Sequence, residues 1–211
     1  MSLPHTSNRS DRRLDKERAI LREAEAQFAR LGLEGATLEG IAAALGMSRH
    51  ALLYYYPSKE LLYRHVLDDV MQHWLAGMGA LALADDPRQG LADYIGSKLQ
   101  SSRDRPDGSR VFTQEVIAGA PHYSEAITHQ VRPVLDADVR TFEHWARTGR
   151  VRSNDFRHLI FMIWAMTQAY ADHEPQFALL LGKPALQDDD FAAAHDVILR
   201  MAWGALAPDP T

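Results

Sequence analysis

The sequence predicts an all-α protein with an N-terminal three-helix head, which contains a helix-turn-helix, and a C-terminal helical bundle body. Three observations support this fold class. Apolar residues recur at spacings of three and four along most of the chain, which is the period of an amphipathic helix. Capping side chains, glycines and prolines separate these stretches. Alternation of period two never persists for more than a few residues, so no sheet is expected.

The head opens with one amphipathic helix, expected over about residues 11–30. Its apolar residues recur every three or four positions, and Gly32 closes the stripe. The stripe consists of Leu14, Ile20, Leu21, Ala24, Phe28 and Leu31. The preceding residues, 1–10, are polar and lack the apolar centre of a secretory signal. We therefore expect a disordered tail over 1–10.

Two short helices follow, joined by a turn that contains a glycine. Thr37 precedes the first helix and can cap its free N–H groups, and Gly46 ends it. Ser48 caps the second helix, which Pro57 stops. Two short capped helices with such a turn are typical of a helix-turn-helix. We therefore assign residues 11–57 to a helix-turn-helix domain.

Residues 58–211 are expected to form the helical body. Glycine, proline and aspartate punctuate this part of the chain and separate its helices. The expected helices span about 58–83, 90–103, 108–119, 122–149, 155–173 and 188–206.

The last two of these helices predict a dimer. The helix at 155–173 is apolar all round between Leu159 and Met166, and such a helix must be covered on every side. The final helix carries an apolar stripe from Phe191 to Ala205. Two such helices from each of two chains would bury both stripes in a four-helix interface, so we expect a homodimer.

The composition excludes several classes of protein. The chain has 211 residues, of which 46% are apolar, so it can bury a substantial core. The absence of cysteine excludes disulfides, Cys-ligated zinc, iron–sulfur clusters and a thiol nucleophile. The longest apolar run spans about eight residues, well short of the roughly 20 that cross a bilayer. We expect a cytoplasmic protein without a membrane span.

The charge is distributed unevenly. Residues 1–64 contain ten Lys and Arg against eight Asp and Glu, whereas residues 65–211 contain thirteen against twenty. A small basic module attached to an acidic body is typical of a DNA-binding head on a domain that does not bind DNA.

The segment from Thr37 to Leu61 resembles the DNA-binding head of the TetR family of transcriptional regulators. Both capping residues, the turn glycine, the aromatic run Tyr54-Tyr55-Tyr56 and the sequence Pro57-Ser58-Lys59-Glu60 occur in register. The resemblance covers about residues 15–65. The chain departs from it at His50, where many members have a small residue, and at Leu53, where many have Tyr.

The resemblance and the physics of recognition together suggest which residues contact DNA. A recognition helix presents its N-terminal residues to base edges, while helix starts and polar side chains bind phosphate. Arg49 and His50 occupy that start, and Arg49 can bind either guanine N7 and O6 or a phosphate. The expected DNA contacts are Thr37, Ser48, Arg49, His50, Tyr54, Tyr55 and Lys59. Alternatively, the three tyrosines could lie in the core of the head, and Lys59 could be a solvent-exposed residue in the first turn of its helix. We favour the core position for Tyr56 and phosphate contact for Tyr55 and Lys59.

Further along, two segments are similar to one branch of the same family, the pyrimidine-utilisation regulators that respond to uracil and thymine. They are Ala118-Gly119-Ala120-Pro121 and the run from Phe161 to Asp172. This similarity extends over nearly the full length. It implies that residues 58–211 bind a ligand and dimerise. It also implies a double-stranded DNA operator and a small-molecule effector as partners.

Three polar or aromatic residues lie roughly on one face of the helix at 155–173, namely Trp164, Gln168 and Asp172. A pyrimidine dione is flat and carries carbonyl acceptors beside an N–H donor. The Gln168 amide offers the complementary donor and acceptor, and Trp164 offers a stacking face. Lys98, Arg103 and Phe112 match the same branch and would close the pocket. The alternatives are a core role for Trp164 and surface positions for Lys98 and Arg103.

The ten histidines form no catalytic pattern. The chain has no zinc-binding His pair, no nucleophile elbow and no Gly-rich phosphate loop. The neighbours Asp172, His173 and Glu174 point around a helix and cannot all face one metal ion. We expect no enzyme, no metal and no cofactor, but a ligand-responsive repressor. The rival hypotheses are an unrelated effector, a small helical enzyme or carrier, and an architectural DNA-binding protein without an effector.

Overall fold

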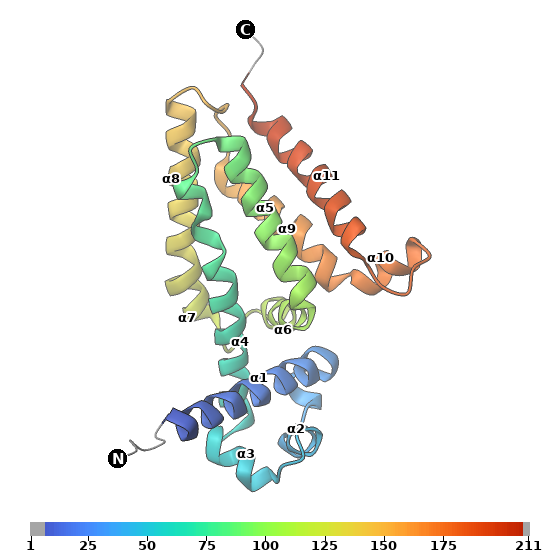
Figure 1. The fold of residues 1–211 in the computed structure, drawn as a ribbon. Helices are drawn as coiled ribbons and strands as arrows, with labels where there is room; N and C mark the ends of the chain where they lie inside the picture. The colour runs from blue at the N-terminus through green and yellow to red at the C-terminus, as the bar shows by residue number, and fades with distance from the viewer. Residues whose placement is uncertain (1–6, 209–211) are drawn as a thin grey trace, which may run out of the picture.

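The computed structural model describes residues 7–208, and within this range the regular structure is entirely helical (Figure 1). Helices α1 (Ser7–Gly35), α2 (Leu38–Ala44) and α3 (Arg49–Tyr55) form a head at one end of the molecule. Helix α4 (Lys59–Ala76) runs from the head into a larger helical body. The predicted all-α architecture of head and body is confirmed.

The start of α1 corrects one expectation. The helix begins at Ser7, so residues 7–10 are helical and not part of a tail, whereas residues 1–6 lie outside the described range. Extending a helix that has already nucleated costs little, which explains why a polar segment can join it. At the other end, Gly32 has a φ of 70° and kinks the helix at the predicted stop.

The helix-turn-helix forms through the predicted caps. The Thr37 hydroxyl accepts a hydrogen bond from the Gly40 N–H at 3.0 Å, and the Ser48 hydroxyl accepts one from the Ala51 N–H at 3.1 Å. Gly46 has a φ of 62°, in the left-handed region that glycine adopts without strain. The predicted helix-turn-helix is therefore confirmed, with the turn between α2 and α3 where the sequence places it.

The head has its own hydrophobic core, to which α4 contributes. Ile20, Ala24 and Phe28 of α1 pack in one cluster with residues of α2, α3 and the first half of α4. Tyr56 is buried in this cluster at 6% exposure, which confirms the core role expected for it. Since α4 packs with the head before it enters the body, the two parts share this helix.

The body is built around one central helix. Helix α5 (Pro87–Asp104) packs against both α9 (Phe156–Asp172) and α11 (Asp188–Leu206). Tyr94, Phe142 and several aliphatic side chains form the core between them. The other elements are η1 (Met78–Leu83), α6 (Pro106–Ile117), α7 (Ser124–Ala126), the π-helix η2 (Ile127–Val131), α8 (Arg132–Arg147) and α10 (Glu174–Leu180).

The structure differs from the expected set of body helices in three main places. The helix expected at 58–83 is divided at Gly77 into α4 and η1. The helix expected at 122–149 consists of α7, η2 and α8 in succession. Helix α10 was not predicted, because its seven residues are too few to show a helical period.

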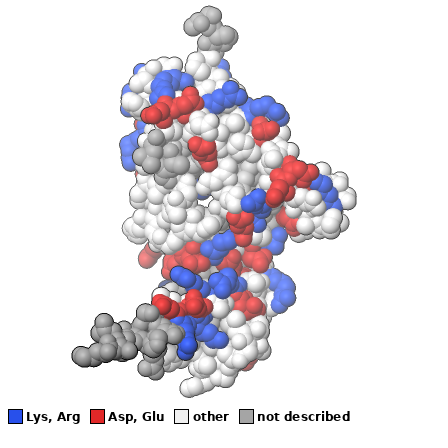
Figure 2. All heavy atoms as spheres, in the orientation of Figure 1, with Lys and Arg blue, Asp and Glu red and all other residues white. Residues whose placement is uncertain are grey.

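Charged side chains tie α6 to the head, and Figure 2 shows them as a band where head and body meet. Arg105, at the start of α6, forms ion pairs with Glu25 of α1 and, at 2.9 Å, with Asp69 of α4. Gln114 donates to the Ala29 carbonyl at 2.9 Å, and the Tyr63 hydroxyl donates to Glu115 at 3.1 Å. Glu25 and Glu115 are both buried. Helix α6 is thus held by both α1 and α4.

Candidate nucleic-acid interface and ligand cavity

Helix α3 presents polar and aromatic side chains to solvent. Arg49 and His50 at its start and Tyr54 near its end are exposed, and Tyr55 is half-buried. Tyr54 and Tyr55 meet edge to face, with ring centroids 5.4 Å apart. The start of α3 is therefore open to a partner that enters from outside the head.

The caps and Arg49 already have contacts within the protein. The hydroxyls of Thr37 and Ser48 each accept one backbone hydrogen bond, which leaves the O–H of each free to donate. Arg49 Nε lies 2.6 Å from Glu39 Oε1, and both side chains are largely exposed. An exposed pair of this kind stabilises by only about 0–1 kcal/mol. A phosphate or base edge can therefore compete for the Arg49 guanidinium.

Lys59 has a structural contact that the sequence did not indicate. Its ammonium donates to the carbonyls of Ala36, at 3.2 Å, and Glu34, at 3.4 Å. These carbonyls lie at and just beyond the end of α1, where carbonyls lack helical partners. An ammonium has three donors, so one remains for another acceptor. Lys59 both closes α1 and retains the capacity to bind phosphate.

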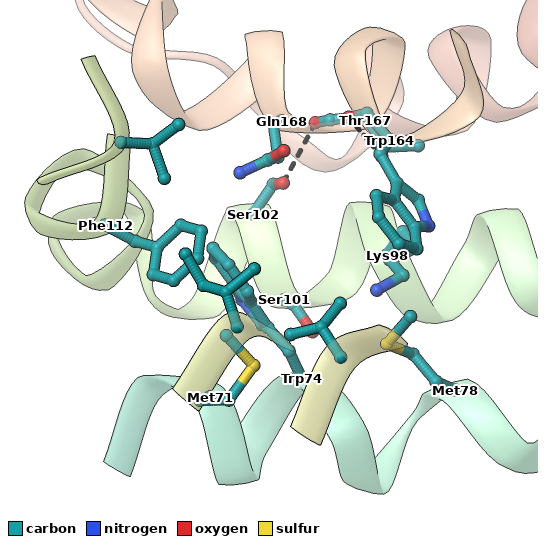
Figure 3. A pocket seen from close by; sticks show the side chains of 13 residues that line it. Met71, Trp74, Met78, Lys98, Ser101, Ser102, Phe112, Trp164, Thr167 and Gln168 are labelled. Carbon is teal, nitrogen blue, oxygen red and sulfur yellow. Dashed lines mark hydrogen bonds between the residues drawn. The ribbon is translucent and has the colours of Figure 1, made fainter. Parts of the chain in front are cut away.

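The body contains an apolar cavity of about 200 Å³ between α4, α5, α6, η2 and α9 (Figure 3). Four of the six predicted ligand-binding residues line it: Lys98 of α5, Phe112 of α6, and Trp164 and Gln168 of α9. The remaining lining residues are Met71, Trp74, Met78, Ser101, Ser102, Val116, Ile127, Val131 and Thr167. The tertiary structure thus brings four of the six predicted residues to one cavity.

Most polar groups around the cavity are already hydrogen-bonded. Ser102 donates to the Thr167 carbonyl at 2.9 Å, and Ser101 donates to the Ser97 carbonyl at 3.1 Å. The Gln168 side chain extends toward the cavity (Figure 3), and its amide has no hydrogen bond to any described residue. Gln168 is half-buried, and its amide atoms are not among the buried unpaired polar atoms, so the amide can pair with a group that enters the cavity. Gln168 is therefore the group best placed to bind a polar ligand.

Aromatic side chains form two walls of the cavity. Trp74 and Phe112 meet edge to face, with centroids 4.8 Å apart. The Trp164 indole N–H donates to the Tyr94 hydroxyl at 2.6 Å, which fixes the orientation of the ring. A planar ligand in the cavity would therefore lie among aromatic side chains.

A pair of opposite charges, the half-buried Lys98 and the buried Asp138, lies beside the Trp164 wall. The Lys98 ammonium is 5.5 Å from the Trp164 ring centroid and 5.7 Å from that of Tyr94. Burial lowers the pKa of Lys98 to about 8, although the Asp138 charge opposes this shift. Burial also raises the pKa of Asp138 to about 6, opposed by Lys98 and by the Tyr94 hydroxyl. Asp138 Oδ2 is buried without a hydrogen-bond partner among the described residues.

The structure places the other two predicted ligand-binding residues outside the cavity. Arg103 points to the surface, where it pairs with Asp104 at 3.1 Å and with Asp188 at 3.0 Å. The Asp172 carboxylate accepts hydrogen bonds from Ser109 and Thr113, both at 2.7 Å, and so ties α9 to α6. Neither residue lines the cavity, and the polar groups of both are engaged elsewhere.

Sequence reasoning missed the contribution of α4 to the cavity. Met71 and Trp74 of α4 and Met78 of η1, which follows α4, recur at the spacings of three and four that mark one helix face. That pattern was visible, but it looks the same as an ordinary core stripe. The π-helix residues Ile127 and Val131 gave no local signal at all.

The described part of the chain also lacks metal-binding groups and membrane-spanning helices. Among residues 7–208, no group of three His, Asp or Glu side chains is arranged to hold a metal ion. Every helix in that range is too short or too polar to cross a bilayer.

Both parts of the chain match known protein families. Residues 20–66 match the family described as "Bacterial regulatory proteins, tetR family". Residues 67–209 match the family described as "YcdC-like protein, C-terminal region". The HTH-type transcriptional regulator RutR of Escherichia coli K12 is 40% identical over 186 residues, which cover 88% of this chain and 87% of RutR.

Solved structures share the fold at low sequence identity. The ketosteroid transcriptional regulator KstR2 of Mycobacterium tuberculosis superposes with a TM-score of 0.75 at 17% identity, over 92% of this chain and 96% of KstR2. The TetR family regulator PfmR of Thermus thermophilus superposes with a TM-score of 0.70 at 19% identity, over 86% of this chain and 97% of PfmR. These likenesses establish the architecture of head and body.

The coupling between Lys98 and Asp138 can be measured. In Lys98→Met, burial acts on the Asp138 carboxyl without an opposing cation, so its pKa should rise above about 6. Between pH 6 and about 8 the folded variant keeps a proton on Asp138 that its unfolded chain has released, whereas in wild type Lys98 is protonated and Asp138 ionised in both the folded and the unfolded state. Its free energy of unfolding, relative to wild type, should fall as the pH rises through this window. Urea unfolding at several pH values measures the effect.

The control is a Lys98→Met/Asp138→Asn double variant, in which neither position titrates. It should lose the pH dependence that the single variant shows. Parallel pH profiles for wild type and Lys98→Met would contradict the coupling.

Proposed function

Because this chain belongs to the TetR family and is a DNA-binding transcriptional regulator, we propose that a small pyrimidine dione binds in its cavity and lowers its affinity for operator DNA. Uracil and thymine are the first candidates. One observation carries the proposal: the unpaired Gln168 amide lies in an apolar cavity lined by aromatic rings. The resemblance to the pyrimidine-utilisation branch supports the same ligand class.

The Gln168 amide matches the edge of an imide. Its carbonyl accepts from the ligand N–H, and its NH₂ group donates to an adjacent ligand carbonyl. A site built around such a pair rejects analogues that lack the matching groups, because the protein amide would then stay unpaired. The Lys98 ammonium, at the same cavity, provides a further donor for a carbonyl oxygen.

The size of the cavity favours a small ligand. Its volume of about 200 Å³ lies below the roughly 300–1,000 Å³ of pockets that hold drug-sized molecules. Trp74 and Phe112 on one side and Trp164 on another leave room for a flat ring more readily than for a bulky one. A single planar heterocycle satisfies both constraints.

Helix α6 supplies a route from the cavity to the head. Phe112 and Val116 of α6 line the cavity, while Arg105, Gln114 and Glu115 of the same helix contact α1, α4 or both. A ligand that displaces Phe112 would move α6 and, with it, the head. The ligand must bind the two head positions with different affinities, and a tenfold loss of DNA affinity requires about 1.4 kcal/mol of such coupling.

We infer a homodimer that forms through the outer face of α9 and α11. Phe161 and Met162 of α9 and Val197 and Met201 of α11 are exposed. Apolar side chains gathered on adjacent helices are typical of a protein interface. A two-fold dimer through this face would present two α3 helices to major-groove sites about one turn, roughly 34–36 Å, apart. The operator should then be approximately palindromic.

The DNA contacts differ in kind and can be separated. If Lys59 binds phosphate, Lys59→Ala should weaken binding to all sequences alike and lower the slope of log affinity against log salt by about one. His50→Ala should instead change which sequence is preferred. Titrations of a selected operator and a scrambled duplex at several salt concentrations measure both. If Lys59→Ala protein has a lower affinity but an unchanged slope, Lys59 stabilises the end of α1 and does not contact phosphate.

The dimer face can be tested by charge. Met162→Glu or Met201→Glu should shift the protein from dimer to monomer at micromolar concentration, because each buries a carboxylate in an apolar interface. Light scattering measures the mass. Ile117→Glu, at an 81% exposed position on α6, is the matched control and should leave the dimer intact. Wild-type protein that is monomeric with its helical content unchanged would refute the interface.

The effector can be tested at the amide itself. Gln168→Leu keeps the bulk but leaves the imide edge unpaired, so affinity for the ligand should fall by about 1–3 kcal/mol. Calorimetry with uracil, thymine and close relatives measures this. Operator DNA should weaken ligand binding by the same factor by which the ligand weakens DNA binding.

Arg103→Gln is the matched control, since Arg103 lies outside the cavity. It should bind the ligand as wild type does. Wild-type protein that binds no pyrimidine, or Gln168→Leu protein that binds as tightly as wild type, would exclude this ligand class.

A further inference from the structure

Helix α1 extends well ahead of the part of the chain that matches the family. The match to the tetR family begins at residue 20, whereas α1 begins at Ser7. Ile20, Ala24 and Phe28 form the buried face of α1 in the head core. The turns before Ile20 therefore overhang that core, and Figure 1 shows the N-terminal end of α1 projecting past α4 at the edge of the head.

The buried face of α1 continues into this overhang as a basic face. At about 100° per residue, Arg13 and Lys16 lie within roughly 40° of the direction of Ile20 around the helix axis. Asp11 and Asp15 point to the opposite side by the same count. Arg13 is 63% exposed. Glu17 lies on the same side as these bases, about 60° from Ile20. The side of the overhang that faces the rest of the head thus carries Arg13, Lys16 and one acid, Glu17.

The basic face lies next to the end of the recognition helix. The Arg13 guanidinium is hydrogen-bonded to Glu17 at 2.9 Å. That contact raises the pKa of Arg13, and the charges of Tyr54 and Tyr55, when these are ionised, add to the shift. Figure 1 shows the N-terminal half of α1 beside α3, in agreement with this contribution. Tyr54 is 75% exposed there, so the same surface is open to a partner.

We propose that the N-terminal turns of α1 bind the phosphate backbone of the operator through Arg13 and Lys16, beside the groove that α3 enters. The proposal rests on the DNA-binding role of the head and is independent of the effector. Cations on a rigid helix next to α3 would meet the backbone that flanks the base contacts. Such contacts fix the position of the protein on the duplex and carry no sequence information.

The contact with Glu17 does not prevent this. An exposed ion pair stabilises by only about 0–1 kcal/mol, whereas Arg can bind phosphate through two parallel, charge-assisted hydrogen bonds. Arg13 uses its Nε toward Glu17, so its two terminal nitrogens remain available. Release of counterions from DNA adds to the gain for every phosphate that a cation neutralises.

The test compares two double variants of the same helix that change the net charge equally. Arg13→Gln/Lys16→Gln removes two cations from the inner face, and Arg18→Gln/Arg22→Gln removes two exposed cations from the outer face. Fluorescence anisotropy with the selected operator and a scrambled duplex of the same length, at several salt concentrations, gives affinity and slope. Circular dichroism melting confirms that both variants fold.

The inner-face variant should lose affinity for both duplexes by the same factor. Its slope of log affinity against log salt should fall by about 0.9 for each lost phosphate contact, hence about 1.8. The outer-face variant should stay close to wild type. Equal affinities and slopes for the two variants would overturn the proposal, as would a changed sequence preference in the inner-face variant, which would place these side chains at base edges. Wild-type protein that does not distinguish operator from scrambled DNA would instead refute specific recognition by the head.

Discussion

The position of α6 between the head and the cavity is the constraint on which the rest of the architecture depends. Its residues contribute to the cavity wall, and its polar side chains are fixed to α1 and α4 through Arg105, Gln114 and Glu115. Because Glu25 and Glu115 are buried, breaking these contacts would leave charges without partners, which is costly. Helix α6 therefore connects the head to the wall of the cavity. In the function proposed above, a change in the shape of the cavity reaches the DNA-binding surface through this helix.

The cavity combines an apolar lining with a few polar groups of unequal availability. Serines 101 and 102 are satisfied by backbone carbonyls, whereas Gln168 is unpaired. Lys98 and Asp138 keep charge near an apolar wall, at a cost in desolvation that their mutual attraction only partly offsets. A protein that needed only stability would fill this space with aliphatic side chains. Retaining unpaired polarity here is characteristic of a binding site.

Two surfaces of the molecule suit partners of different chemistry. The outer face of α9 and α11 carries exposed apolar side chains, which suit a second copy of the chain. The head carries exposed bases on α1 and α3, which suit a polyanion. These two surfaces lie in different parts of the molecule, the bases in the head and the apolar side chains on α9 and α11 in the body (Figure 1).

The sequence by itself determined the elements whose signals are local. Thr37, Gly46 and Ser48 define the helix-turn-helix because caps and a left-handed turn act within one turn of helix. Only the tertiary structure decided the cavity, because Trp74, Val116 and Ile127 come from elements far apart in the chain and each looks like a core residue in its own helix. It also decided that Asp172 binds Ser109 and Thr113 and that Arg103 pairs with Asp188. A periodic pattern shows which face of a helix is apolar, but the partner of a polar side chain depends on how distant helices pack.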